Sequence, residues 1–161
     1  MIVTLNDLAK LRTRHKEQKI VYIGGTFDLL HFGHVRSFEE AKKLGDILLV
    51  SVDSDEATRH YKPSGRPIIN EGQRASMVNA LQVVDYVIIN PLGDISKNPY
   101  NEINVIERLR PDIFVTSHTE GWKPIFEKLE TIKPEVVGFK HDLAPIHTSD
   151  IIAKIHSAVA D

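Results

Sequence analysis

The sequence predicts an α/β fold: a doubly wound, Rossmann-like parallel sheet of about five strands with helices on both faces. Five short apolar runs, rich in β-branched residues, are nearly continuous rather than alternating, which is typical of strands covered on both faces. Segments with a helical pattern separate these runs, and such alternation favours right-handed βαβ units. The expected strands are residues 19–23, 46–52, 85–89, 112–116 and 135–139.

Helices are expected between the strands and at both ends of the chain. An opening helix over 5–15 lies within residues 1–18, which precede the first strand. The internal helices are expected at 35–44, 71–81, 100–110 and 123–132. The last helix carries an apolar stripe at helical spacing, formed by Ile151, Ile152, Ile155, Ala158 and Val159. We find no repeat or linker, so residues 1–161 are expected to form a single domain.

Composition excludes several classes of function. The net charge of −2 lacks the basic excess of most nucleic-acid-binding proteins, so no nucleic-acid partner is expected. The chain has no cysteine, which excludes disulfides and cysteine-ligated metals. No apolar run reaches membrane-spanning length and no signal core opens the chain, so we expect a cytoplasmic protein without a membrane partner.

The stretch "GGTFDLLHFGHVRS", 24–37, links the first expected strand to a helix. It therefore lies past the carboxyl end of a strand, where open α/β sheets bind ligands. The unpaired amide groups of a helix that begins near Gly33 or His34 form a natural phosphate site. His31 and His34 can each donate a hydrogen bond to a phosphate oxygen there. Donors fixed around a phosphorus centre stabilise charge that develops on its oxygens, and no side-chain nucleophile is needed.

Two other interpretations of this stretch remain. The histidines can simply cap a helix while the glycines form a turn. Histidine also binds metals, but no third ligand of obvious kind lies nearby. Asp28 is expected to be held within the turn.

The segment "GGTFDLLHFGH" resembles the signature of the cytidylyltransferase-like nucleotidyltransferases, in which two histidines flank two residues, the second of them glycine. That resemblance implies an enzyme that joins a nucleoside triphosphate to a phosphorylated small molecule and releases pyrophosphate. The catalytic residues it implies are His31, His34 and Lys62. The implied nucleotide-binding residues are Gly25, Thr26, Phe27, Gly33, His34, Arg74, Thr148 and Ser149. The implied acceptor-binding residues are Lys62, Arg66 and His118.

Residues 4–89 are most similar to bacterial heptose-phosphate adenylyltransferases and next to glycerol-3-phosphate cytidylyltransferases. The shared features include Lys62, the "RP" pair that begins at Arg66, and Glu71 three residues before Arg74. Lys62 is a mobile loop cation that can neutralise phosphate, or else a solvated loop lysine. Arg74 can contact phosphate through two donors, or else form a structural salt bridge.

The segment "APIHTSDIIAKI", 144–155, resembles the last motif of this superfamily, a hydroxyl-rich turn that opens the final helix. By resemblance, Thr148 and Ser149 hold the β- and γ-phosphates; the simpler interpretation is an N-cap. The chain departs from the family pattern at three places. Ser117 and His118 replace a Gly-Asp pair, Lys140 and His141 stand where many members have arginine, and His147 replaces a serine.

The resemblance favours transfer of a nucleoside monophosphate, from ATP rather than CTP, to a phosphorylated sugar such as a heptose 1-phosphate. A cytidylyltransferase for a polyol or amino-alcohol phosphate and an FMN adenylyltransferase are the alternatives within the enzyme class. A nucleotide-binding regulatory domain without turnover is the alternative outside it. The resemblance implies Mg²⁺, held mostly by phosphate and water, and a homodimer.

Overall fold

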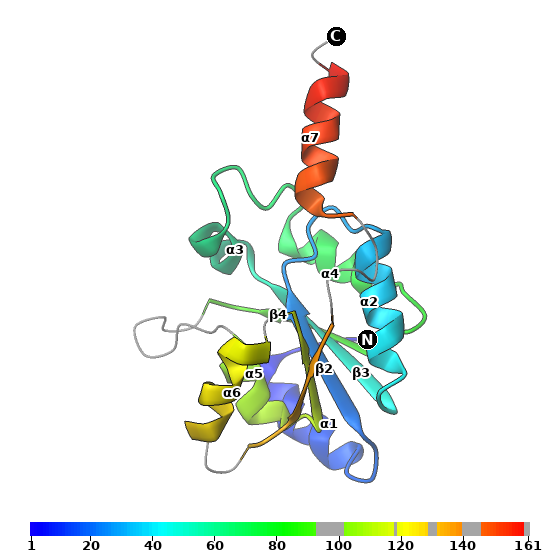
Figure 1. The fold of residues 1–161 in the computed structure, drawn as a ribbon. Coiled ribbons are helices and arrows are strands. Elements are labelled where there is room, and N and C mark those ends of the chain that lie inside the picture. Colours follow the sequence, from blue (N-terminus) through cyan, green and yellow to red (C-terminus); the bar gives the residue numbers. More distant parts are fainter. Residues whose placement is uncertain (93–101, 118, 129–131, 140–145, 160–161) are drawn as a thin grey trace.

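The computed structural model describes residues 1–92, 102–117, 119–128, 132–139 and 146–159 (Figure 1). The strands are β1 (Ile2–Val3), β2 (Ile20–Gly25), β3 (Ile47–Asp53), β4 (Tyr86–Asn90), β5 (Ile113–Thr116) and β6 (Glu135–Gly138). The helices are α1 (Leu8–Arg14), α2 (Phe32–Lys42), α3 (Asp55–Tyr61), α4 (Glu71–Asn79), α5 (Ile103–Leu109), α6 (Thr119–Lys128) and α7 (Thr148–Val159). A short 3₁₀ turn, Leu5–Asp7, precedes α1.

The described strands form one sheet in the order β1-β4-β3-β2-β5-β6, and every pair is parallel. From β2 the chain passes outward through β3 to β4, and β5 then returns to the other side of β2. The strand order therefore reverses between β2 and β5. That reversal opens a crevice at the carboxyl ends of these two strands, the usual place for a ligand in such a sheet.

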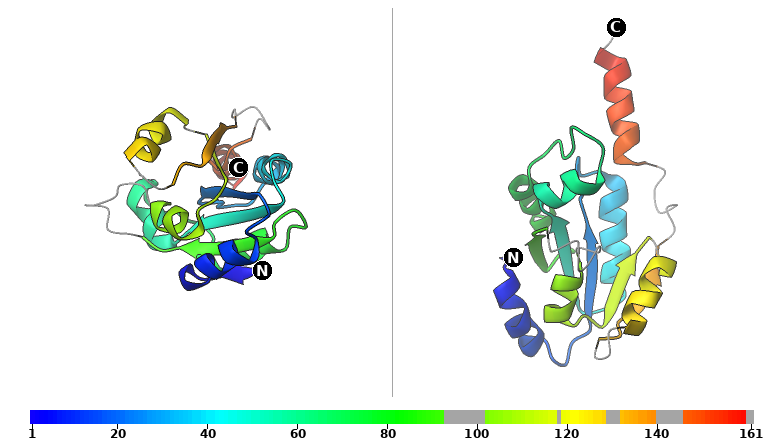
Figure 2. Two further views of the ribbon diagram at one scale, coloured as in Figure 1. Left: turned by 90° about the horizontal axis from the view of Figure 1, so that it is seen from below. Right: turned by 90° about the vertical axis from the view of Figure 1, so that its left-hand side faces the viewer.

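Helices cover both faces of the sheet, as predicted (Figures 1 and 2). Alternate side chains of β2 show the division, because Tyr22 belongs to one hydrophobic cluster and Val21 to the other. Tyr22 packs with residues of α1, α5 and α6, whereas Val21 packs with residues of α2 and α4. Both β2 residues are fully buried, which explains why the strand has a continuous apolar run.

All five predicted strands are confirmed, but two elements were missed. The sheet has a sixth strand, β1, whose two residues pair with Val87 and Ile88 and are too few to produce a pattern. Helix α3 was also missed because it buries only Ala57 and Thr58. The sequence feature that identifies α3 is its N-cap: the side chain of Ser54 accepts a hydrogen bond from the amide of Ala57.

Two predicted helices begin earlier than expected. Helix α2 begins at Phe32 and α6 at Thr119. Their first turns were not predicted because the apolar residues at helical spacing lie only in the later turns.

Helix α7 projects beyond the rest of the fold, away from the helices that cover the sheet (Figures 1 and 2). The predicted helix is confirmed, but its apolar stripe is open to solvent, with Ile155 53% and Val159 79% exposed. Among the described residues, no helix is long and apolar enough to cross a membrane.

Candidate active site

A cavity of about 610 Å³ lies at the carboxyl ends of β2 and β5, at the point where the strand order reverses. Most of its lining comes from four parts of the chain: the motif after β2, the segment that follows α3, the end of β5, and the start of α7. Glu102, Trp122 and Phe139 complete it. The predicted site residues that line it are Gly25, Thr26, Phe27, His31, Gly33, His34, Lys62, Arg66, Thr148 and Ser149. The topology therefore gathers residues that are up to 124 positions apart along the chain, as from Gly25 to Ser149.

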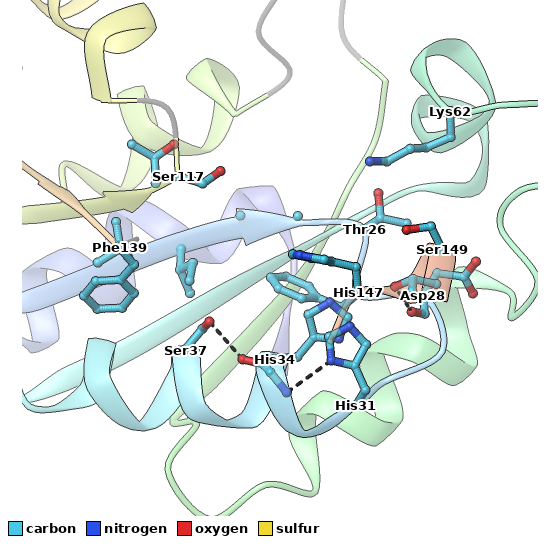
Figure 3. Close-up of a pocket in the computed structure, with 18 of the residues that line it drawn as sticks. Thr26, Asp28, His31, His34, Ser37, Lys62, Ser117, Phe139, His147 and Ser149 are labelled. Atoms are coloured by element: carbon cyan, nitrogen blue, oxygen red, sulfur yellow. Dashed lines mark hydrogen bonds between the residues drawn. The ribbon is translucent and has the colours of Figure 1, made fainter. Parts of the chain in front are cut away.

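His31 and His34 lie stacked at the N-terminus of α2, with ring centroids 3.8 Å apart and planes 22° apart (Figure 3). His31 occupies the N-cap position, where its Nδ1 accepts a hydrogen bond from the amide of Gly33 over 3.1 Å. Since Nδ1 acts as an acceptor, the proton of neutral His31 resides on Nε2. Nε2 is therefore the donor that His31 can offer to a ligand in the cavity.

Gly33 allows this close arrangement. A Cβ at this position would lie 3.0 Å from the His31 ring and 3.3 Å from the carbonyl oxygen of Ile146, just before α7. Both distances are too short for a side chain without rearrangement. The glycine between the two histidines therefore lets the ring of His31 and the start of α7 both approach the first turn of α2.

Both histidines are neutral near pH 7. Burial, with a smaller contribution from neighbouring His31, lowers the pKa of His34 to about 3. Burial also lowers the pKa of His31, and His147 adds to that effect. Nδ1 of His34 is buried without a partner in the part of the chain that the structure describes. The stacked pair therefore offers neutral N–H donors, and positive charge in the cavity has to come from other side chains.

Lys62 and Arg66 supply that charge from the segment after α3. The Nζ of Lys62 lies 5.7 Å from the centre of the Tyr61 ring and has no ion pair among the described residues. Figure 3 shows Lys62 on the same side of the cavity as Thr26 and Ser149. Arg66 donates from Nε to Asp28 over 2.6 Å, which leaves its two terminal nitrogen atoms for a ligand.

The carboxylate of Asp28 holds the motif in place, as the sequence predicted. It accepts hydrogen bonds from Arg66, Ile68, Ile69 and Leu29, and the residue is 1% exposed. Burial raises the pKa of Asp28, but these hydrogen bonds outweigh burial and keep the pKa below its ordinary value.

The turn around Asp28 is strained. Phe27 and Leu29 both have left-handed φ values, 50° and 48°. Such conformations cost roughly 1 kcal/mol or more each in residues other than glycine. The hydrogen bonds of Asp28 compensate for that cost, and its backbone oxygen also accepts from Thr148 Oγ1 over 3.0 Å. One buried residue thus connects the motif, the segment that follows Arg66 and the start of α7.

The two hydroxyl residues at the start of α7 have different surroundings. The helix begins at Thr148, so the cap position belongs to His147, whose amide donates to Asp150 over 2.9 Å. The hydroxyl of Thr148 is already bonded to Asp28 and therefore positions the helix. Ser149 lines the cavity and keeps the predicted place for a phosphate contact.

Arg74 lies behind the site rather than in it. It is fully buried, and each of its three donor nitrogens has a protein partner. Nε donates to the Ile69 carbonyl over 2.8 Å, Nη1 to the Thr26 carbonyl, and Nη2 to Asp55 over 2.6 Å. These contacts agree with the structural alternative, in which Arg74 holds the motif through the Thr26 carbonyl. The contact with nucleotide stays a prediction.

Thr26 belongs to a separate polar network. Its hydroxyl lies 3.3 Å from Asp53 and 3.1 Å from the Tyr61 hydroxyl, which also donates to Asp53. His118 lies outside the described residues, while its neighbour Ser117 lines the cavity at the end of β5. Glu102 also lines the cavity but was not predicted, because no motif marks the segment after β4.

Comparison with known proteins agrees with this geometry. A family model described as cytidylyltransferase-like matches residues 22–154. Bifunctional protein HldE of Campylobacter jejuni subsp. doylei is 35% identical over 142 residues, which cover 88% of this chain and 29% of the relative. HldE of Helicobacter pylori strain G27 is 42% identical over 101 residues, or 63% of this chain and 20% of the relative. The chain thus spans less than a third of the length of these curated relatives.

Two solved structures extend the comparison. The lipopolysaccharide core biosynthesis protein of Thermoplasma volcanium matches with 28% identity and a TM-score of 0.64, over 76% of this chain and 97% of the other. A pantoate-beta-alanine ligase of Francisella tularensis, complexed with beta-gamma ATP and beta-alanine, shares the fold. Its identity is 14% and its TM-score 0.55, over 100% of this chain and 79% of the other. With the family model matched from β2 into α7, and the histidine pair placed where the strand order reverses, the chain belongs to the cytidylyltransferase-like family.

Proposed function

We propose that this chain transfers a nucleoside monophosphate, preferably from ATP, to a phosphorylated sugar such as a heptose 1-phosphate, and releases pyrophosphate. The stacked pair His31–His34 at the N-terminus of α2 is the observation that carries the proposal. Two neutral donors beside the unpaired amides of a helix start suit the oxygens of a reacting phosphate. The cavity that they face is large enough for a small ligand.

In the proposed reaction, an oxygen of the acceptor's phosphate attacks the α-phosphorus of the nucleotide in line. The new P–O bond forms as the bond from the α-phosphorus to the bridging oxygen of the β-phosphate breaks, and pyrophosphate leaves with that electron pair. His31 and His34 donate hydrogen bonds to the phosphate oxygens, where charge develops. Lys62 and Arg66 neutralise the charge of the transferred and leaving groups.

A divalent cation is part of this proposal. The described residues contain no group of three or more His, Asp or Glu side chains that could hold a metal ion. A cavity lining without such a group fits a Mg²⁺ ion that would be held by the triphosphate and water rather than by side chains. Magnesium readily keeps water ligands. The ion would supply further neutralisation of the phosphates when bound.

The choice of acceptor is supported by the relatives. HldE proteins and a lipopolysaccharide core biosynthesis protein are among the most similar proteins. This agrees with the resemblance of residues 4–89 to heptose-phosphate adenylyltransferases. A cytoplasmic location, a homodimer and a single domain over 1–161 stay predictions from the sequence.

Pyrophosphate release tests the proposal. The full chain is incubated with Mg²⁺, each of ATP, CTP, GTP and UTP, and a panel of acceptors that includes heptose 1-phosphate, glycerol 3-phosphate, phosphoethanolamine and FMN. We expect the strongest release with ATP and a sugar phosphate. Strong release with CTP and glycerol 3-phosphate or phosphoethanolamine would replace the proposed substrates, and ATP with FMN would do the same. Nucleotide binding without release from any pair would favour a regulatory domain.

A further inference from the structure

The carboxyl group of Glu102 has no function in the mechanism above. Glu102 occupies the N-cap position of α5, yet its side chain makes no capping hydrogen bond. The carboxyl group accepts a hydrogen bond from its own backbone amide and has no ion pair in the part of the chain that the structure describes. The residue lines the cavity beside the phosphate-binding motif. A mostly buried carboxyl group with only this local contact has acceptor positions left unused, so a ligand is the natural partner.

Gly24 keeps Glu102 open to the cavity. A Cβ on Gly24 would lie 3.0 Å from Cγ of Glu102 and 3.3 Å from its Oε1. The same Cβ would lie 3.3 Å from the hydroxyl oxygen of Tyr22. Any side chain at this position would fill the space between the Glu102 and Tyr22 oxygens, and only glycine leaves that space free.

Tyr22 gives a second, independent indication of a ligand. The residue is fully buried, and its hydroxyl oxygen has no hydrogen-bond partner among the described residues. It borders the same space as Glu102. The Ser51 side chain is the other polar group beside the Tyr22 hydroxyl. The O–H of Tyr22 can turn toward Glu102 and fix one of its carboxyl oxygens. The other oxygen then remains for a group of the substrate.

The charge of this region suits the uncharged part of a substrate rather than its phosphates. Burial raises the pKa of Glu102 to about 7, and the nearby Asp53 carboxylate adds to the rise. The carboxylates of Glu102 and Asp53 repel a phosphate, so this end of the cavity disfavours one. Lys62 and Arg66 supply the cationic part of the same cavity. The phosphates therefore belong beside the histidines and these cations, and the remainder of the acceptor extends toward Glu102.

We propose that Glu102 recognises the acceptor by accepting hydrogen bonds from its hydroxyl groups, with Tyr22 as the positioning residue behind it. The inference rests on the proposed function and assigns a residue of this chain to the hydroxyl groups of its acceptor. Hydroxyl groups are the expected partners because a sugar phosphate offers them beyond its phosphate, and a carboxyl oxygen accepts hydrogen bonds from them.

The experiment compares the parent with Glu102→Gln, Glu102→Ala and Gly24→Ala, and with Glu107→Gln as a matched control. Glu107 lies on the same helix and is exposed to solvent. Pyrophosphate release is measured with the acceptor varied at saturating nucleotide, and then with nucleotide varied at saturating acceptor. Thermal unfolding of each variant checks that it is folded.

We expect Glu102→Ala to raise the KM for a sugar phosphate by roughly tenfold to a hundredfold, the range for loss of a hydrogen bond to a charged group. The KM for the nucleotide should change by less than about threefold, since the phosphate contacts remain. Glu102→Gln should have a smaller effect because its amide oxygen can still accept a hydrogen bond. Gly24→Ala should also raise the acceptor KM, and Glu107→Gln should match the parent.

Three results would overturn the inference. An acceptor KM that is unchanged in folded Glu102→Ala would show that the carboxyl does not contact the acceptor. A loss confined to the nucleotide KM would assign Glu102 to the other substrate. A parent that prefers phosphoethanolamine, with the preference lost in Glu102→Gln, would show that the carboxyl binds an ammonium group. A parent that is inactive with every pair would instead refute the proposed function itself, and this inference with it.

Discussion

Replacement of Asp28 by asparagine tests how the site is held together. Oδ2 of Asp28 accepts from Arg66 Nε over 2.6 Å and from the Ile68 amide over 2.8 Å. Oδ1 accepts from the amides of Leu29 and Ile69 over 3.1 Å and 3.0 Å. Asparagine has one acceptor oxygen, so its NH₂ group would face donors on the other side. Asp28→Asn therefore keeps the shape of the side chain but leaves one pair of donors without an acceptor.

The expected cost follows from these contacts. The side chain of Asp28 is 0% exposed and that of Arg66 14%, so water screens their ion pair little. Loss of a charge-assisted hydrogen bond costs about 1.5–3 kcal/mol, and a buried backbone N–H without an acceptor costs about 1–3 kcal/mol. Together they lower the free energy of unfolding by roughly 3–5 kcal/mol. Because a domain of this size is typically stable by about 5–15 kcal/mol, the variant should still fold.

Urea unfolding measures the loss, and pyrophosphate release of the folded variant measures its effect on the site. Asp112→Asn is a matched control, because Asp112 also accepts from an arginine and a backbone amide, Arg12 at 2.7 Å and Ile20 at 2.8 Å. Its side chain is 40% exposed and lies at the other end of the sheet, so we expect a smaller loss of stability and normal turnover. A loss below about 1 kcal/mol in Asp28→Asn, or normal turnover, would refute this account of Asp28.

Three further predictions concern His34 and Arg74. His34→Asn should lower turnover about a hundredfold or more, the scale for one preorganised donor, with the melting temperature little changed; equal turnover in variant and parent would remove His34 from the mechanism. Since the pKa of His34 falls from 6.5 to about 3 on folding, the unfolded chain binds more protons between these values. Stability is therefore full above pH 6.5 and is lost as the pH falls toward 3. The parent should lose about 2 kcal/mol more than His34→Asn between pH 7 and pH 5 in urea unfolding, and equal losses would contradict the shift. Arg74→Met should lower the free energy of unfolding by about 2–4 kcal/mol because it leaves two carbonyls and Asp55 without a donor. Titration calorimetry should show that the nucleotide affinity of Arg74→Met is within about threefold of the parent's. A tenfold loss of affinity would instead support the predicted contact between Arg74 and phosphate.

The sheet could be predicted because strands that are buried on both faces consist of nearly continuous apolar residues. Residues such as Val21 and Tyr22 face opposite clusters, so β2 reads as an unbroken apolar run. Helix α3 could not be predicted by the same means. It lies largely in solvent and buries only Ala57 and Thr58, so apolar periodicity is absent and only the cap at Ser54 identifies it.

The site was predictable where the local sequence fixes the geometry. His31 and His34 are three residues apart, and a helix that begins at Phe32, within the motif, is enough to stack them at its N-terminus. Arg74 was different because its partners at Thr26 and Asp55 are 48 and 19 residues away. Glu102 was not predicted at all, since only the packing of α5 against β2 brings it beside Gly24.

One measurement tests the proposed transfer reaction most directly. It compares pyrophosphate release from ATP and heptose 1-phosphate by the parent and by His34→Asn. We predict acceptor-dependent release by the parent and about a hundredfold less by the variant, with both proteins folded. Release that does not require an acceptor, or that is equal in the two proteins, would contradict the proposed reaction.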